Sequence, residues 1–245
     1  MKMTIEEFKL FAERCVSEDV TRPGFTKAFR AGARAYVTDG RIALALDLTG
    51  DMDVSGIEYS YSHIPGMIDK YITDFCSALS AGKCEAFSLD AAKLRAAADA
   101  TFADLKPHED YLRIYEPDPD DPDDERSEES IRYVHERYSR VILPDRGQTI
   151  IAGHFAAILA DVLAETNTSV AYTRRAVKDS AIFTFGENWY LLLMPLRTDS
   201  CLISTRWLDA SAIADAATGK LLLSYGDAKQ IDLDALRFPG KGGEA

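Results

Sequence analysis

The chain has 245 residues, of which 47% are hydrophobic and 28% are charged, a balance typical of a globular protein with one large or two modest domains. No apolar run approaches the roughly 20 residues that span a bilayer, and the N-terminus lacks the apolar stretch of a signal peptide, so we expect a cytoplasmic protein. Its four cysteines and four histidines are scattered without metal-ligand spacing, which predicts free thiols, no metal site and no cofactor.

The net charge of −12 is concentrated in one segment. Residues 116–129 hold nine acids and one base, so the remaining chain carries a net charge of only −4. Asp118, Asp120 and Asp123 in this segment could hold calcium, but the segment lacks the glycine turn and terminal glutamate of an EF-hand. Its prolines and its lack of apolar residues favour a mobile acidic loop instead.

The first predicted helix begins at a Thr-x-x-Glu capping box over residues 4–7, and apolar side chains recur at helical spacing over residues 5–15. A β-hairpin is then predicted over residues 35–48, with its turn at Asp39-Gly40. An Asp-Gly pair tolerates the positive φ angles of a tight hairpin turn.

Periodicity and turn residues indicate the remaining elements in chain order. The pattern predicts helices over 67–79, 90–102, 153–164 and 208–217, and strands over 83–89, 111–115, 131–143, 169–173, 181–185, 189–194 and 220–225. The glycine-rich end of the chain is expected to be disordered. Helices mixed with mainly antiparallel strands predict the α+β class.

The chain contains a weak internal repeat. Residues 4–12 align with residues 88–96, and the same offset places residues 71–79 against residues 155–163. Duplication of a strand–helix–strand–helix unit would produce this match. Helix amphipathicity alone would also produce it, so both interpretations stay open.

Four segments, in this order along the chain, resemble segments of the bacterial DNA sliding clamp, the β subunit of the replicative DNA polymerase. They are the hairpin Thr38–Ala43, the helix entry Phe87–Leu94, the helix with its lead-in Ile150–Leu159, and the strand end Leu193–Arg197. The resemblance implies DNA clamp-like repeats, each with helices packed on antiparallel sheets. It divides the chain into a truncated domain over 1–84, a second domain over 85–197 that carries the acidic loop, and a C-terminal extension over 198–245.

In the sliding-clamp family, the hairpin and the strand end form one hydrophobic pocket for short partner peptides. Carried over to this chain, the resemblance implies a pocket lined by Thr38, Gly40, Arg41, Ile42, Leu193, Met194, Pro195, Leu196 and Arg197. Without the resemblance, the same residues would be a plain hairpin turn and a buried strand.

The resemblance also implies helices that face DNA and neutralise phosphates with basic side chains. The candidates lie on or beside the first helix of each repeat and are Lys9, Arg14, Arg22, Lys93 and Arg95. The helix over 153–164 carries no lysine or arginine, and it contains the acidic Asp161.

The sequence contains no glycine-rich phosphate loop, no G-x-S-x-G motif and no metal-binding histidine pair, so we expect a non-enzyme. The leading hypothesis is a polymerase processivity factor that binds replication proteins and, as a homo-oligomer, encircles double-stranded DNA. The alternative is an interaction or regulatory protein that uses the same fold without contacting DNA. A small hydrolase whose site leaves no motif in the sequence is a weaker third alternative.

Overall fold

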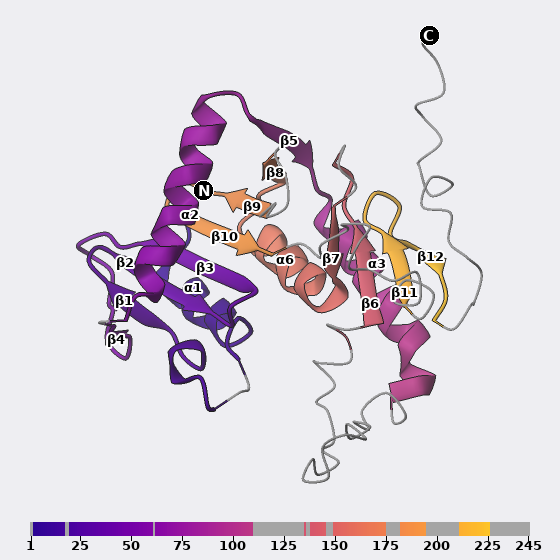
Figure 1. Cartoon of the computed structure of the whole chain (residues 1–245), viewed down its shortest axis with the longest axis horizontal. Helices are drawn as coiled ribbons and strands as arrows, with labels where there is room; N and C mark the ends of the chain where they lie inside the picture. Colours follow the sequence, from indigo (N-terminus) through magenta and orange to yellow (C-terminus); the bar gives the residue numbers. More distant parts are fainter. Residues whose placement is uncertain are drawn as a thin grey trace, which may run out of the picture.

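A computed structural model describes residues 2–17, 20–60, 62–109, 135, 138–145, 149–174, 182–194 and 211–225. Over these residues the protein is α+β, with four α-helices and two β-sheets (Figure 1). The helices are α1 (Ile5–Ala12), α2 (Ile64–Ser80), α3 (Ala91–Leu105) and α6 (Gly153–Glu165).

The larger sheet has eight strands in the order β4-β1-β2-β3-β10-β9-β8-β5. All neighbouring pairs are antiparallel except β1 and β4. Its strands are β1 (Phe29–Ala31), β2 (Arg34–Thr38), β3 (Ile42–Asp47), β4 (Glu58–Tyr59), β5 (Cys84–Ser88), β8 (Val170–Arg174), β9 (Ile182–Phe185) and β10 (Trp189–Leu193).

The smaller sheet has four strands in the order β12-β11-β6-β7, and α3 packs against it. They are β6 (Ser139–Ile142), β7 (Ile150–Ala152), β11 (Ala212–Asp215) and β12 (Lys220–Leu223). The expected extension over 198–245 therefore contributes two strands to a sheet that begins within the preceding segment.

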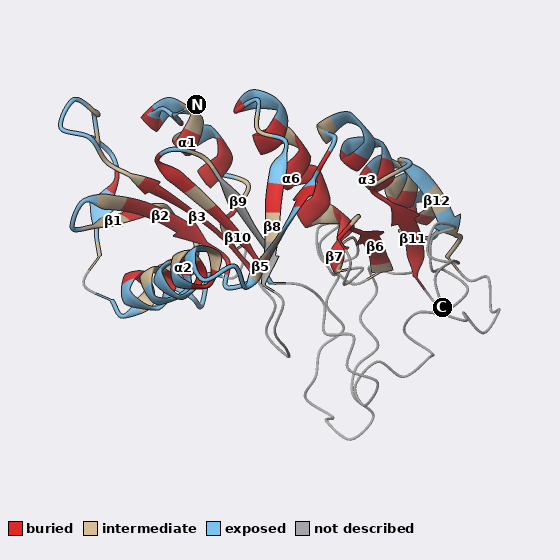
Figure 2. Cartoon of the chain, turned by 90° about the horizontal axis from the view of Figure 1, so that it is seen from above, coloured by how far each residue is buried: buried red, intermediate tan, exposed pale blue. Residues whose placement is uncertain are grey.

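Three helices, α1, α6 and α3, lie side by side on one side of the sheets, and α2 covers the opposite face of the larger sheet (Figure 2). We call α1, α6 and α3 the helix row. Strand residues alternate between two cores: Leu44 and Leu191 pack toward the helix row, whereas Ala45 and Leu192 pack toward α2. Across the described residues, no helix has both the length and the apolar character needed to cross a membrane.

Most of the helices predicted from periodicity are confirmed. The Thr4–Glu7 capping box is present at the start of α1, and α6 begins and ends within one residue of the prediction. Helix α2 begins three residues earlier than predicted, at Ile64, because Pro65 fits the first turn of a helix. The acidic loop over 116–129, the strand over 111–115 and the glycine-rich end lie outside the described residues.

Two predictions of secondary structure are wrong. Over the predicted helix 208–217 the structure has strand β11, whose residues are all buried and which pairs in parallel with β6. Among the described residues of the predicted long strand 131–143, Ser139–Ile142 form β6, whereas His135 and Tyr138 are helical. Tertiary pairing decided the structure of β11, where the local apolar pattern was compatible with either a helix or a strand.

The repeat seen in the structure differs from the one aligned in the sequence. The sequence repeat matches residues of α2 with residues of α6, but these two helices lie on opposite faces of the larger sheet. The structure instead repeats a helix followed by three antiparallel strands, α1-β1-β2-β3 and α6-β8-β9-β10. Reading outward from the central β3–β10 pair gives β3-β2-β1 on one side and β10-β9-β8 on the other, an approximate local two-fold arrangement.

Helix α6 closely approaches the smaller sheet at Gly153, the first residue of the helix. A Cβ atom there would lie 1.7 Å from the Ser139 hydroxyl oxygen and 3.0 Å from that of Thr101. These two hydroxyl groups are fully buried and hydrogen-bonded to each other at 2.5 Å. Glycine is therefore required here for packing.

We expect Gly153→Ala to lower the free energy of unfolding by roughly 2–3 kcal/mol, because the added methyl group has no space. Gly66→Ala on α2 is the matched control, since a Cβ atom there meets nothing within 4 Å. That control should be neutral or stabilising by about 0.5 kcal/mol. Urea unfolding followed by circular dichroism measures both changes, and equal stability of the two variants would contradict the packing argument.

Candidate functional site

The structure brings the two segments of the predicted peptide site together at the junction of β3 and β10. Ile42 lies directly opposite Leu193 in the antiparallel pair. One residue further along, the Met194 amide donates a hydrogen bond to the Arg41 carbonyl at 2.8 Å. Segments far apart in the sequence therefore meet through backbone pairing at one end of this strand pair.

The hairpin turn, Thr38–Ile42, is held by its own side chains. The Asp39 carboxylate accepts hydrogen bonds from the amides of Arg41 at 2.7 Å and Ile42 at 2.8 Å. The Thr38 hydroxyl accepts from the Gly40 amide at 2.9 Å and donates to the Ile42 carbonyl at 2.7 Å. Gly40 has a φ of 95°, which an L-residue rarely adopts. The turn is therefore fixed in shape.

Arg22, expected on the DNA-facing side, lies against the tip of this hairpin turn. Its guanidinium sits 4.2 Å from the centre of the Phe25 ring, a cation–π contact. A Cβ atom on Gly40 would lie 3.2 Å from the Arg22 guanidinium and 3.4 Å from Phe25. Arg22 and Phe25 thus form a wall beside the turn, and Arg22 is not part of the helix row.

The exposed and buried members of the predicted site are distinct. Gly40, Arg41 and Met194 are exposed, with 39% of Met194 accessible. Thr38, Ile42 and Leu193 are buried and support the junction from beneath. The remaining predicted residues, Pro195, Leu196 and Arg197, lie outside the described residues.

At the opposite end of the β3–β10 strand pair, the contact is stabilised by Asn188, which was not predicted from the sequence. The Asn188 side chain accepts from the Met3 amide at 2.8 Å and donates to the Met3 carbonyl at 3.0 Å. The Asn188 backbone carbonyl accepts a hydrogen bond from the Asp47 amide at 2.7 Å. Asn188 therefore ties the residues before α1 and the end of β3 to the turn before β10.

A polar cluster, also not anticipated, attaches α2 to the sheet on the opposite face. Arg34 on β2 contacts Asp47 at 2.6 Å and also Asp69 of α2, and the Tyr36 hydroxyl donates to Asp69 at 2.8 Å. Burial and the Asp69 carboxylate raise the pKa of Tyr36. Burial also raises the pKa of Tyr190, which lies beneath the Arg34 guanidinium.

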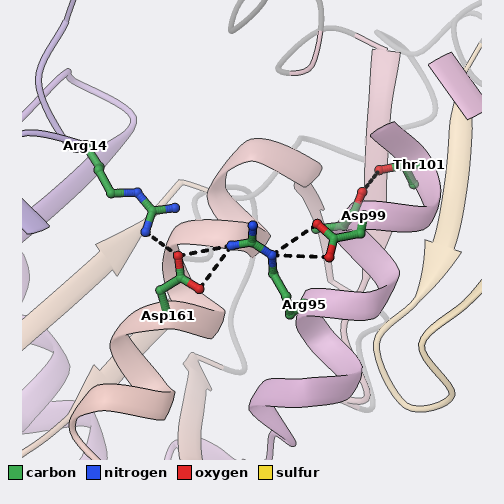
Figure 3. A network of polar contacts seen from close by, with 6 residues as sticks. Arg14, Arg95, Asp99, Thr101 and Asp161 are labelled. Atoms are coloured by element: carbon green, nitrogen blue, oxygen red, sulfur yellow. Dashed lines mark hydrogen bonds and ion pairs between the residues drawn. The ribbon is translucent and has the colours of Figure 1, made fainter. Parts of the chain in front are cut away.

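The basic residues expected to face DNA are mostly paired with acids of the helix row itself. Lys9 contacts Glu6 at 3.2 Å, and Arg14 contacts Asp161. Arg95 contacts Asp161 at 3.0 Å and Asp99 at 3.0 Å (Figure 3). The structure therefore brings Arg14 and Arg95 together, but at a carboxylate of α6.

Lys93, the remaining candidate, lies apart from these ion pairs at the start of α3. It lines a cavity of about 590 Å³ between this helix start and the end of α6, together with Asp90, Leu163 and Asn167. The Asp90 carboxylate caps α3 by accepting from the Lys93 amide at 3.1 Å. This cavity mixes apolar and polar walls and has no direct link to the β3–β10 junction.

Over the described part of the chain, no three histidine, cysteine, aspartate or glutamate side chains are grouped so as to hold a metal ion. Comparisons with protein-family models, with curated proteins and with solved structures find no match to this chain.

We expect Asp39→Ala to loosen the hairpin turn, because the buried Ile42 amide and the partly buried Arg41 amide would lose their acceptor. The free energy of unfolding should fall by about 1–3 kcal/mol. Asp39→Asn retains a side-chain carbonyl oxygen at the same place, so it should lose clearly less stability. Chemical unfolding of both variants measures the difference, and an equal loss would show that the two amide contacts contribute little.

Proposed function

We propose that the chain is a sliding-clamp-like, non-catalytic protein that binds short peptides of partner proteins at the β3–β10 junction, as a polymerase processivity factor does. The observation that carries this proposal is the hydrogen bond between the Met194 amide and the Arg41 carbonyl. It joins two segments of the chain that resemble the two halves of one peptide pocket in the sliding-clamp family.

The exposed groups at this place suit a linear peptide. The Met194 side chain is flexible and apolar, so it adapts to apolar residues of different shapes. The hairpin turn beside it is fixed in shape, so little conformational entropy is lost there on binding. Pro195 lacks an amide hydrogen and would interrupt strand pairing directly after this point.

The proposed processivity role also requires a ring of more than one copy. The chain has room for two clamp-like domains, which are too few to encircle a DNA duplex alone. The larger sheet ends at β5, which pairs with β8 on one side only among the described strands. An edge strand of this kind can pair with a neighbouring copy.

A second candidate function is an interaction or regulatory protein that contacts peptides but not DNA. One observation favours it: Lys9, Arg14 and Arg95 are all paired with acids of the helix row. Basic groups that already have carboxylate partners contribute less to phosphate binding. Both candidates share the peptide site and differ in the role of the helix row.

For the peptide site, we expect Met194→Asp to weaken binding of a fluorescent peptide copied from a replicative polymerase tail by about tenfold or more, since a charge would replace an apolar contact. Leu222→Asp on β12 is the matched control, because Leu222 is exposed at 40% and lies in the smaller sheet, whereas β3 and β10 belong to the larger one. Fluorescence anisotropy measures both affinities. Unchanged binding by Met194→Asp would exclude the site.

For the ring, we expect light scattering over a concentration series to give a discrete dimer or trimer, because edge-strand pairing between copies would close the assembly. A monomer at every concentration would contradict encirclement of DNA. The peptide-binding scaffold without DNA contact would then be the remaining function.

A further inference from the structure

Asp161 occupies a distinctive position in the helix row. Helix α6 is buried along most of its length, and its only charged residues are Asp161 and Glu165. The Asp161 side chain is about one-third accessible to solvent, at 33%. It therefore presents a carboxylate on the outer side of the middle helix, between α1 and α3.

Two arginines from different elements converge on this single carboxylate. Arg14, just after α1, contacts one Asp161 oxygen, and Arg95 of α3 contacts both oxygens at 3.0 and 3.1 Å. Figure 3 shows the two guanidinium groups approaching Asp161 from opposite sides. Asp99 accepts from the Arg95 Nε at 3.0 Å and so occupies the other edge of that guanidinium.

Arginine guanidinium groups bind phosphate and carboxylate oxygens through the same donors and with similar geometry. Two arginines brought to one point would otherwise form a site for a nucleic-acid phosphate. In this chain an aspartate of the protein holds that place. The helix row and the two residues after α1 contain seven acidic and four basic residues, over residues 5–14, 91–105 and 153–165. The net charge of this region is therefore negative and does not neutralise the charge of Asp161.

We infer that Asp161 is a specificity-determining residue that keeps the helix row from binding duplex DNA by occupying Arg14 and Arg95. This inference deepens the second candidate function and is independent of the peptide site. Each ion pair is partly exposed, and exposed ion pairs contribute little to stability, so removing the carboxylate should leave the fold intact.

The test is Asp161→Asn, with Glu165→Gln as the matched control. Both variants lie on α6 and remove one negative charge, but Glu165 makes no ion pair among the described residues. Fluorescence anisotropy with a short labelled DNA duplex, over a series of salt concentrations, measures affinity. Peptide binding by the same proteins is recorded separately, so failure of this inference and failure of the proposed function are distinguishable.

We expect Asp161→Asn to bind the duplex about tenfold more tightly than the original protein at low salt. The slope of log affinity against log salt concentration should become steeper by an amount that corresponds to up to about two additional phosphate contacts. Glu165→Gln should change the affinity by no more than about twofold, because it frees no arginine. Adding Arg95→Gln to Asp161→Asn should remove most of the gain. Equal gains in Asp161→Asn and Glu165→Gln would overturn the inference, as would tight duplex binding by the original protein.

Circular dichroism melting curves establish whether Asp161→Asn is folded. If it is not, Asp161→Ala is the second variant, because it also removes the carboxylate that holds Arg14 and Arg95 and alanine is the residue that a helix tolerates best. The same gain in duplex affinity is then expected, with the same increase in salt dependence. No gain in Asp161→Ala would overturn the inference in that case.

Discussion

The antiparallel pairing of β3 with β10 is the interaction on which the rest of the structure depends. It joins two helix-plus-three-strand units into one sheet, which β4 and β5 extend to eight strands, and it lets the helices of the two units share a single core. It is fastened at both ends, by Asn188 near Met3 and by the Met194 amide at Arg41. Disrupting this pair would separate the two halves and remove the proposed peptide site with them.

The charges of the helix row show how a fold and a function can diverge. Helices arranged side by side provide a surface that could track a DNA backbone, provided that their basic groups are available. Here Asp161, Asp99 and Glu6 take up those groups within the protein. Assigning a nucleic-acid role from the arrangement of helices alone would therefore overlook the carboxylates that already pair with these basic groups.

Local signals in the sequence predicted much of this arrangement. The Thr4–Glu7 capping box marked α1, and Asp39-Gly40 marked the hairpin, because their hydrogen bonds lie within a few residues. The local sequence wrongly predicts a helix at β11, because the strand depends on pairing with β6, from a distant part of the chain. The partners of Asp161 likewise come from other elements, so a single helix could not reveal them.

The long sequence separation of the β3–β10 contact has a consequence for how the protein is made. The bonds between Met3 and Asn188 span 185 residues, so the first half of the sheet is synthesised long before its partner. Until β10 emerges from the ribosome, β3 presents an apolar strand edge that can pair with other chains. Loop closure over such a distance slows folding. The nascent chain thus carries an unpaired apolar strand until its partner is synthesised, and during that time association with other chains competes with folding.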